Sequence, residues 1–166
     1  MTTGQAFEIR PATGADAGAI ADVHLVSHRE TYIPLIGQGA YWPIDAAERL
    51  AEWQQALAGD GIVLVAIAAG RVIGFGHAEG ERIHTLYILP AWHRRGIGRA
   101  LIAELCRVLA ARGVALAHFA VLEVNKKAIA FYEALGARAT GKALIEEHGM
   151  TYEDRLFEIA TSLATP

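Results

Sequence analysis

The stretch from Leu86 to Arg112, LYILPAWHRRGIGRALIAELCRVLAAR, constrains the fold of this chain more than any other. It begins as a strand that ends at Pro90, crosses a basic loop, and continues as a helix with one apolar face. The loop carries Gly96 and Gly98 where the helix begins. Backbone N–H groups at a helix N-terminus, with arginines beside them, are typical of a phosphate site. We therefore expect helices packed on a sheet, with an anion-binding loop.

The composition indicates one folded domain spanning residues 1–166. Hydrophobic residues make up 53% and charged residues 20% of the chain, and the mean hydropathy is +0.26, which disfavours disorder. The net charge of −3 argues against nucleic acid as a partner. The basic residues Arg94, Arg95 and Arg99 cluster locally, which suits one small anionic ligand.

The cysteine count and the hydropathy pattern restrict the cellular context. A lone Cys106 excludes a disulfide framework and a cysteine-based zinc site, and we expect it to be a small core residue of a helix. No signal peptide opens the chain, and no apolar run is long enough to span a bilayer. We therefore expect a cytoplasmic protein that does not bind membranes.

The first part of the chain predicts one strand and two helices. The strand is Phe7–Arg10, because its residues alternate and a proline follows. Thr13 and Asp16 predict a capping box that opens the first helix, and Pro34 is expected to end it at the preceding residue. The second helix is expected from about 45 to 57, with apolar residues at helical spacing.

The rest of the chain predicts six strands and two helices. In chain order, the pattern indicates strands 62–67, 71–78 and 82–89, a helix 97–112, a strand 114–122, a helix 125–135, and strands 138–146 and 151–159. The whole order is βααβββαβαββ. It predicts an α/β (α+β, three-layer) fold: a mixed, mostly antiparallel sheet of about seven strands, with about four helices on both faces.

The glycine loop lacks the features of the two common nucleotide motifs. A P-loop needs Lys and then Ser or Thr after its last glycine, but Gly98 is followed by Arg99 and Ala100. A dinucleotide fingerprint needs a third glycine where this chain has Leu101. Gly74-x-Gly76 fails the same test and lies in a predicted hairpin.

Two segments together resemble the GCN5-related N-acetyltransferase (GNAT) superfamily. The acetyl-CoA motif of that family, Gln/Arg-x-x-Gly-x-Gly/Ala, is similar to the run His93-Arg94-Arg95-Gly96-Ile97-Gly98, which has histidine at the first position. The run Asn125-Lys126-Lys127-Ala128-Ile129-Ala130-Phe131-Tyr132-Glu133-Ala134-Leu135-Gly136-Ala137 is similar to the Asn…Ala…Phe-Tyr…Leu-Gly-Phe segment of the family, with alanine at the last position. The element order matches over nearly the whole chain, which implies the GNAT (acyl-CoA N-acyltransferase) fold.

The resemblance implies acetyl-CoA as the cosubstrate. It implies that the backbone of Leu86, Tyr87 and Ile88 pairs with the pantetheine arm, that Asn125 contacts this arm, and that Tyr132 faces the sulfur. The pyrophosphate would bind the loop, whose residues are His93, Arg94, Arg95, Gly96, Ile97, Gly98 and Arg99. Free N–H groups and glycines without Cβ atoms are suited to that contact.

Direct transfer of an acetyl group to an amine has two proton requirements. The amine must lose a proton to a base, and the departing thiolate needs a proton or a hydrogen bond, which the phenol of Tyr132 can provide. We expect His84 to be the base, with Glu81 and Glu79 as alternatives. If strand alternation holds, His84 shares a face with Leu86 and Ile88. Ordinary packing is the competing interpretation of both Tyr132 and His84.

The first helix and the loop after it supply candidate contacts to the acceptor. His24 and His28 have the spacing of metal ligands, but no third ligand is evident, so we expect no metal. In the GNAT superfamily this region usually shapes the acceptor pocket, with loop packing as the alternative interpretation. The candidate substrate-binding residues are His28, Tyr32, Tyr41 and Trp42, together with Glu81.

These features predict an acetyl-CoA-dependent N-acetyltransferase that acts on a primary amine of a small molecule or a peptide amino terminus. The alternative is a non-catalytic module of the same fold that holds CoA or acyl-CoA. Transfer of a longer acyl group, or transfer to oxygen, would change the pocket and not the motif. Relatives often pair through late strands, which allows a homodimer.

Overall fold

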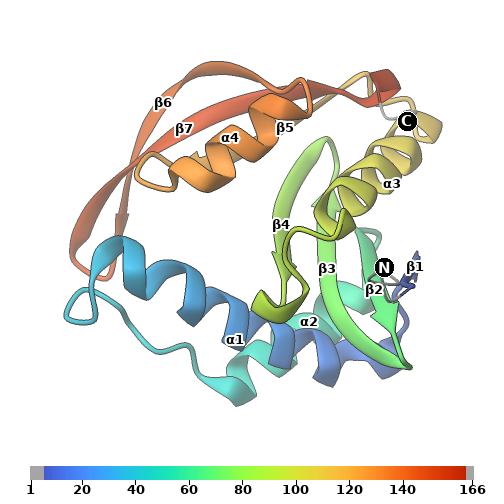
Figure 1. Cartoon of the computed structure of the whole chain (residues 1–166), viewed down its shortest axis with the longest axis horizontal. Coiled ribbons are helices and arrows are strands. Elements are labelled where there is room, and N and C mark those ends of the chain that lie inside the picture. Colours follow the sequence, from blue (N-terminus) through green and yellow to red (C-terminus); the bar gives the residue numbers. More distant parts are fainter. Residues whose placement is uncertain (1–5, 164–166) are drawn as a thin grey trace, which may run out of the picture.

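The computed structural model describes residues 6–163, and the strands in that range form one seven-stranded sheet in the order β1-β2-β3-β4-β5-β7-β6 (Figure 1). The strands are β1 (Glu8–Pro11), β2 (Ile62–Ala68), β3 (Arg71–Glu79), β4 (Arg82–Ile88), β5 (Leu116–Leu122), β6 (Arg138–Glu147) and β7 (Met150–Ala160). The helices are α1 (Ala17–Ile36), α2 (Ala46–Ala58), α3 (Ile97–Ala111) and α4 (Lys126–Ala134), with short 3₁₀ turns η1 (Gly14–Asp16), η2 (Pro90–Trp92) and η3 (Thr161–Leu163). The predicted element order and fold class are confirmed.

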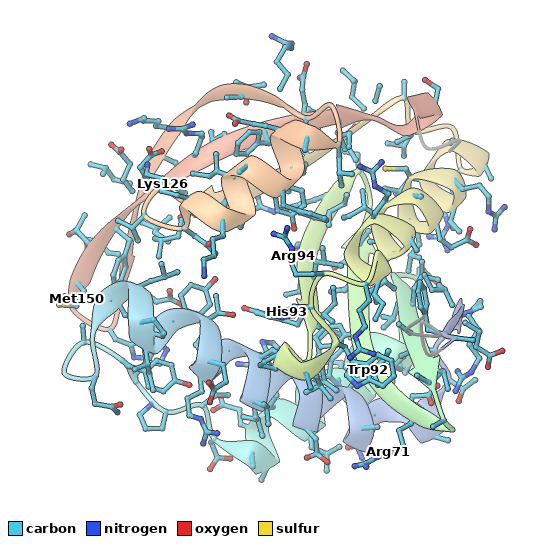
Figure 2. All side chains as sticks on the ribbon, in the orientation of Figure 1. Arg71, Trp92, His93, Arg94, Lys126 and Met150 are labelled. Atoms are coloured by element: carbon cyan, nitrogen blue, oxygen red, sulfur yellow. The ribbon has the colours of Figure 1, made fainter. Side chains whose placement is uncertain are left out.

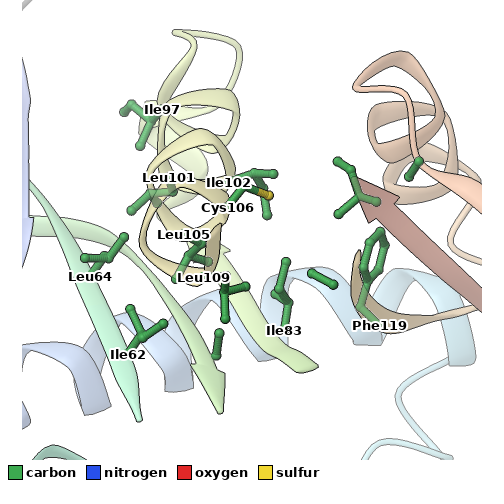
Figure 3. Close-up of a cluster of buried hydrophobic side chains, with 14 of the residues drawn as sticks. Ile62, Leu64, Ile83, Ile97, Leu101, Ile102, Leu105, Cys106, Leu109 and Phe119 are labelled. Atoms are coloured by element: carbon green, nitrogen blue, oxygen red, sulfur yellow. The ribbon is translucent and has the colours of Figure 1, made fainter. Parts of the chain in front are cut away.

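The interior strand β2 explains why helices cover both faces of the sheet. Its residues are apolar throughout, so alternation sends one set of side chains to each face. Val63 and Val65 pack in a core with α1 and α2. Ile62 and Leu64 pack in a second core with α3, where Leu105 is fully buried (Figure 3).

The strands β4 and β5 separate soon after they meet. They are the one parallel pair among the seven strands, and they share a single register position, Arg82 opposite His118. The adjacent backbone bond runs from the N–H of His118 to the carbonyl of Glu81, at 2.9 Å. Beyond this point β5 pairs with β7 along its whole length, and Figure 1 shows β4 diverging from it. One edge of β4 is therefore left without a neighbouring strand.

The helix α1 continues past the proline that we expected to end it. It contains Pro34 and ends at Ile36, so the predicted end is wrong. Proline costs a helix one N–H bond, but here only the last turn is affected. Gly37, with φ of 84°, then closes the helix by donating its N–H to the carbonyl of Ile33 at 2.9 Å. Tyr32 therefore lies within α1, ahead of its last turn.

An ion pair fixes the start of α1 to the first strand. Arg10 of β1 donates two hydrogen bonds to the carboxylate of Asp16, at 2.8 and 2.9 Å. The same carboxylate accepts the backbone N–H of Thr13 at 2.7 Å, which confirms the predicted capping box. The hydrogen bond from Arg10 is the main reason why the pKa of Asp16 is lowered to about 2.

In the described range of the chain, no helix has the length and hydropathy needed to span a membrane.

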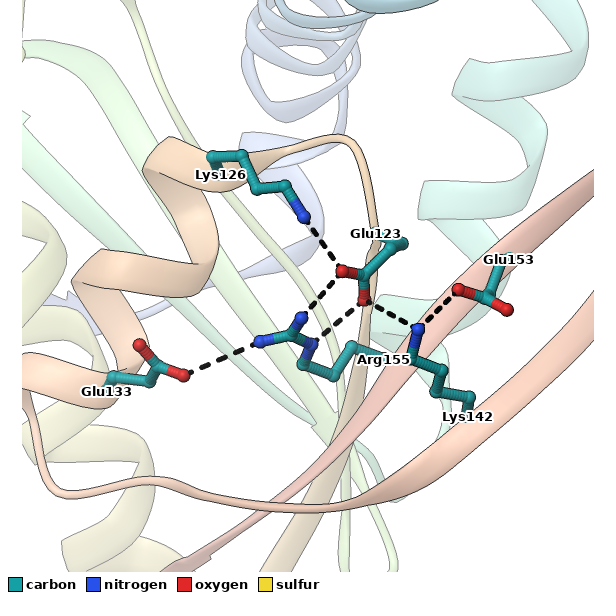
Figure 4. Close-up of polar contacts among 6 residues, drawn as sticks. All are labelled: Glu123, Lys126, Glu133, Lys142, Glu153 and Arg155. Carbon is teal, nitrogen blue, oxygen red and sulfur yellow. Dashed lines mark hydrogen bonds and ion pairs between the residues drawn. The ribbon is translucent and has the colours of Figure 1, made fainter.

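A network of charged side chains fixes the connection between β5 and α4. Glu123 accepts a two-pronged interaction from Arg155 of β7, at 2.9 and 2.6 Å, and a hydrogen bond from Lys126 at 2.7 Å (Figure 4). Arg155 also approaches Glu133 of α4 at 3.7 Å. Lys142 of β6 joins the network through an ion pair with Glu153 of β7. These contacts hold α4 against the last two strands.

We expect Asp16→Asn to lower the free energy of unfolding by about 1–2 kcal/mol near neutral pH, because it removes charge-assisted hydrogen bonds. Since the folded-state pKa of Asp16 is depressed to about 2, its contribution is complete above the unfolded pKa near 4. It is lost as pH falls towards 2. Urea unfolding of both proteins near neutral pH and at about pH 3 measures this convergence. The exposed Asp22→Asn is the control, and an equal effect of both substitutions would contradict the assignment.

Candidate active site

The loop between β4 and α3 has an unusual backbone conformation. Gly96 has φ of 82° and Arg94 has φ of 62°, both in the left-handed region. A left-handed conformation is uncommon for a residue with a side chain and is often found at functional sites. The first hydrogen bond of the helix runs from the N–H of Ala100 to the carbonyl of Gly96, at 3.0 Å. The three preceding N–H groups, from Ile97 to Arg99, therefore point out of the helix end and suit an anion.

Glycine is required at the two positions of the motif for different structural reasons. A Cβ on Gly96 would meet nothing within 4 Å, so its left-handed φ is what requires glycine. A Cβ on Gly98 would lie 3.1 Å from the Phe131 ring of α4 and 3.2 Å from Ile88 of β4. Gly98 thus allows α3 to pack closely against α4 and β4. We had expected both glycines to serve the approach of the ligand.

The basic side chains of the loop extend in different directions. The guanidinium of Arg95 lies over the Trp92 ring, 4.8 Å from its centroid. Arg94 and Arg99 are exposed, and Figure 2 shows His93 and Arg94 on one side of the loop with Trp92 on the other. His93 Nε2 lies 2.8 Å from the carbonyl oxygen of Ile88, so this side chain ties the loop to the end of β4.

The free edge of β4 presents backbone groups at the divergence. The N–H of Leu89 donates to the carbonyl of Ile73 in β3, and backbone direction alternates along an antiparallel strand. The N–H and C=O groups of Leu86 and Ile88 therefore point away from β3. The carbonyl of Ile88 is already hydrogen-bonded to the His93 side chain. This leaves both groups of Leu86 and the N–H of Ile88 for a ligand.

The phenol of Tyr132 reaches the divergence from α4. Its ring packs on Phe119 of β5, with centroids 4.5 Å apart, and on Phe131 at 5.0 Å. Burial, and secondarily the nearby Tyr32, raise the pKa of Tyr132 well above its usual value. Asn125 caps this helix by accepting the N–H of Ala128 at 3.2 Å. The Asn125 side chain thus has a structural use that the sequence analysis did not assign.

An aromatic cluster on α1 and the following loop faces the same region. His28 lies 4.5 Å from Tyr32 and 6.5 Å from Trp42, measured between ring centroids. Its Nδ1 is 3.2 Å from the hydroxyl of Tyr41, and burial lowers its pKa to about 4. The ring of His28 also lies 6.4 Å from that of Tyr87 in β4. The structure therefore brings together the four predicted acceptor residues of this region.

Glu81 is not part of this aromatic cluster. It lies in the exposed turn between β3 and β4, where its backbone carbonyl accepts a hydrogen bond from the N–H of His118.

His24 also lies outside the aromatic cluster of His28. It accepts a hydrogen bond from the indole N–H of Trp53 at 3.1 Å and stacks on Tyr87 at 4.9 Å, and burial lowers its pKa to about 3. We conclude that His24 packs α1 and α2 onto the sheet.

A β-bulge changes the direction of the His84 side chain. The pairing of β3 with β4 shifts between His77 and Ala78, which leaves His84 as the additional residue of β4. The prediction that His84 shares a face with Leu86 and Ile88 assumed strict alternation and is wrong.

His84 lies instead on the face of the sheet that α1 and α2 cover. Its ring stacks on His77 at 5.2 Å, and His77 lies 5.5 Å from Trp53 of α2. Burial is the main cause that lowers the pKa of His84, the charge of Arg82 adds to it, and Glu79 opposes it. A lowered pKa keeps the imidazole neutral near pH 7, which is the form that a base needs.

Two residues of β7 belong to this region and were not identified from the sequence. Arg155 and Phe157 point towards α4, so Asp154 and Tyr152 point to the opposite face. The ring of Tyr152 lies 6.1 Å from that of Trp42. The signal that could have revealed them is this alternation, read together with the long-range pairing of β5 and β7.

Comparisons with known proteins agree with this geometry. The model of the Acetyltransferase (GNAT) family matches residues 25–137. An acetyltransferase of Pectobacterium atrosepticum is 36% identical over 95 residues, which cover 52% of this chain and 67% of that protein. A thialysine N-epsilon-acetyltransferase of Sus scrofa is 36% identical over 56 residues, which cover 34% of this chain and only 33% of that relative.

Solved structures share the fold over nearly the whole chain. A GCN5-related N-acetyltransferase from Rhodopseudomonas palustris superposes with a TM-score of 0.80 at 20% identity, covering 96% of this chain and 99% of that one. An acetyltransferase from Salmonella typhimurium with acetyl-CoA superposes with a TM-score of 0.74 at 20% identity, covering 94% of each chain. Since the family match runs through the glycine loop and α4, and the whole fold agrees with it, the chain belongs to the Acetyltransferase (GNAT) family.

Proposed function

We propose that this chain is an acetyl-CoA-dependent N-acetyltransferase that transfers the acetyl group directly to a primary amine. One observation carries the proposal. At the divergence of β4 and β5, the phenol of Tyr132 packs on Phe119 of β5, and the adjacent Phe131 lies against Gly98 at the N-terminal end of α3, where backbone N–H groups are free. The names of relatives support an amine as acceptor, since they include enzymes acting on thialysine and on glucosamine 6-phosphate.

The residues of the loop and of β4 fit acetyl-CoA. The free N–H groups of Ile97, Gly98 and Arg99, with the exposed guanidinium of Arg94, suit a pyrophosphate. The free backbone groups of Leu86 and Ile88 suit the amides of an extended pantetheine arm, as an added strand would pair. The solved neighbour from Salmonella typhimurium holds acetyl-CoA, and one from Thermoplasma acidophilum holds coenzyme A.

The chemistry requires the amine to be neutral when it attacks. Acetyl-CoA supplies, when bound, a thioester carbonyl that a neutral amine can attack. An alkylamine with a pKa near 10 is mostly protonated near pH 7, a deficit of about 4 kcal/mol at 1.36 kcal/mol per pKa unit. A positioned base offsets part of this deficit, typically by about 10²–10⁴-fold in rate. Positioning of the two substrates accounts for much of the rest.

Tyr132 serves the sulfur as the thiolate departs. Burial raises the pKa of this phenol well above that of an ordinary thiol, so the hydroxyl stays protonated. For the same reason, donating a hydrogen bond to the sulfur is favoured over giving up the proton completely. The rings of Phe119 and Phe131 hold the phenol in place.

His84 is the proposed base. It lies on the face of β4 that carries Tyr87, which is the face of the aromatic cluster. The acceptor would approach from that face, and the thioester would lie at the divergence itself. The stack with His77 fixes the plane of the imidazole.

We expect Gly96→Ala to weaken acetyl-CoA binding at least about tenfold, because a side chain disfavours the left-handed φ that aims the N–H groups. Isothermal titration calorimetry measures the change. Gly113→Ala is the matched control, since Gly113 has φ of 85° and equal space at the other end of α3. If both variants lose similar stability but only Gly96→Ala binds acetyl-CoA more weakly, the result would support the role of this loop in binding the cosubstrate. Equal binding by both variants would contradict it.

With an amine acceptor, the protein should release free thiol from acetyl-CoA, and Tyr132→Phe should lower kcat at least about tenfold. The KM for acetyl-CoA should change little, because the ring and its packing on Phe119 are retained. A thiol-detection assay over a panel of amines provides both values. Tight CoA binding without amine-dependent release by the wild-type protein would indicate a non-catalytic module, and near-wild-type kcat of the variant would remove the role of the phenol.

The pH profile of kcat/KM should show an acidic limb with a midpoint below about 6.5, the ordinary pKa of histidine. The folded pKa of His84 is lowered, so the rate rises with pH through that lower value as the base becomes neutral. His84→Ala should remove the limb, and His77→Ala should keep it. A limb that survives in His84→Ala would end the assignment.

A further inference from the structure

Asp154 lies on the acceptor side of the sheet, beyond the point where β4 and β5 separate. Its register partner in β5 is Leu122, at the opposite end of that strand from His118. Its neighbour Arg155 points towards α4 and is bound by Glu123. Because successive side chains of a strand alternate, the Asp154 side chain lies on the other face of the sheet, the one on which α1 packs.

This carboxylate has no partner among the described residues 6–163. The charged residues on either side of it in sequence are paired, Glu153 with Lys142 and Arg155 with Glu123. Asp154 is partly buried and has no side-chain hydrogen bond or ion pair of its own within that range. Burial is the main cause that raises its pKa, the charge of Glu147 adds to this effect, and the charge of Arg82 opposes it. The carboxylate oxygens are not fully buried, so a cation can still reach them.

A second polar group on the same face of β7 is also unsatisfied. The hydroxyl of Tyr152 is buried and has no hydrogen-bond partner among the described residues. Its ring lies 6.1 Å from that of Trp42, and the Trp42 ring lies 6.5 Å from His28 and 4.3 Å from His148, measured between centroids, so aromatic rings line this side of β7. Aromatic faces attract organic cations. An unpaired carboxylate, a free hydroxyl and aromatic rings form a combination suited to an ammonium group.

The position of Asp154 along β7 separates it from the reaction centre. Tyr132 packs on Phe119 of β5, whose register partner in β7 is Phe157, three residues from Asp154. Asp154 therefore lies about 10 Å along the strand from the place where the phenol packs, and on the opposite face of the sheet. An ammonium held at Asp154 would lie some distance from the amine that attacks, and would not be the group that has to lose a proton.

We infer that Asp154 selects the acceptor by binding a second cationic group, so that the preferred substrate is an alkylamine carrying another positive charge. This inference rests on the proposed N-acetyltransferase function and specifies its substrate class. The anionic cosubstrate and the cationic acceptor would then bind on opposite sides of the divergence.

Two probes of equal length test the inference, 1,5-diaminopentane and 5-amino-1-pentanol, which replaces one ammonium by a hydroxyl. The wild-type protein should prefer the diamine at least tenfold in kcat/KM. Asp154→Asn should lower kcat/KM for the diamine at least tenfold, mainly through KM, and change that for the amino alcohol less than twofold. Glu153→Gln is the matched control, because it removes the same charge from the opposite face and should leave both values unchanged.

Several results would overturn the inference: a diamine preference that survives in Asp154→Asn, an equal loss with both probes, or the same loss in Glu153→Gln. Acetyl-CoA affinity and the thermal midpoint show whether Asp154→Asn is folded, and Asp154→Ser repeats the test with a smaller side chain. Calorimetry of the diamine in the presence of CoA distinguishes the two proposals. Binding that depends on Asp154 without any turnover would reject the transferase and keep the cation site.

Discussion

The separation of β4 from β5 is the constraint on which the site depends. A complete parallel ladder would have used the backbone groups of Leu86 and Ile88 and closed the sheet between α1 and α4. The two strands pair instead at one position, and β5 pairs with β7 along its whole length. The packing of Tyr132 on Phe119 then keeps the helix α4 beside the opening. The divergence is the place where groups from both faces of the sheet can approach one another.

Features that depend on residues close together in sequence were predictable. The capping box of Thr13 and Asp16 and the glycine at the start of α3 involve residues within a few positions, so the local pattern contains the cause. Features that depend on pairing between distant strands were not predictable from the sequence. The bulge at His84 arises from the register of β3 with β4, and the direction of Asp154 arises from the register of β5 with β7. No local signal fixes either register.

The glycine loop shows why a motif can be recognised correctly and explained incompletely. Gly96 is needed for the backbone conformation and Gly98 for the contact with Phe131. That contact joins the N-terminal end of α3, the proposed phosphate site, to the helix that carries Tyr132. The motif therefore couples the position of the cofactor loop to the position of the phenol. The sequence pattern records the two glycines but not this link, because Phe131 is distant in sequence.

Under the proposed function, the distribution of charge suits a different ligand on each face of the sheet. The loop at the start of α3 combines free N–H groups with exposed arginines, whereas Asp154 on the other face pairs with no cation among residues 6–163. A single field of one sign could not attract both an anionic cosubstrate and a cationic amine. Placing the two fields on opposite faces of the sheet removes that conflict. In the proposed mechanism each substrate is drawn to its own side, and the two meet where β4 and β5 separate.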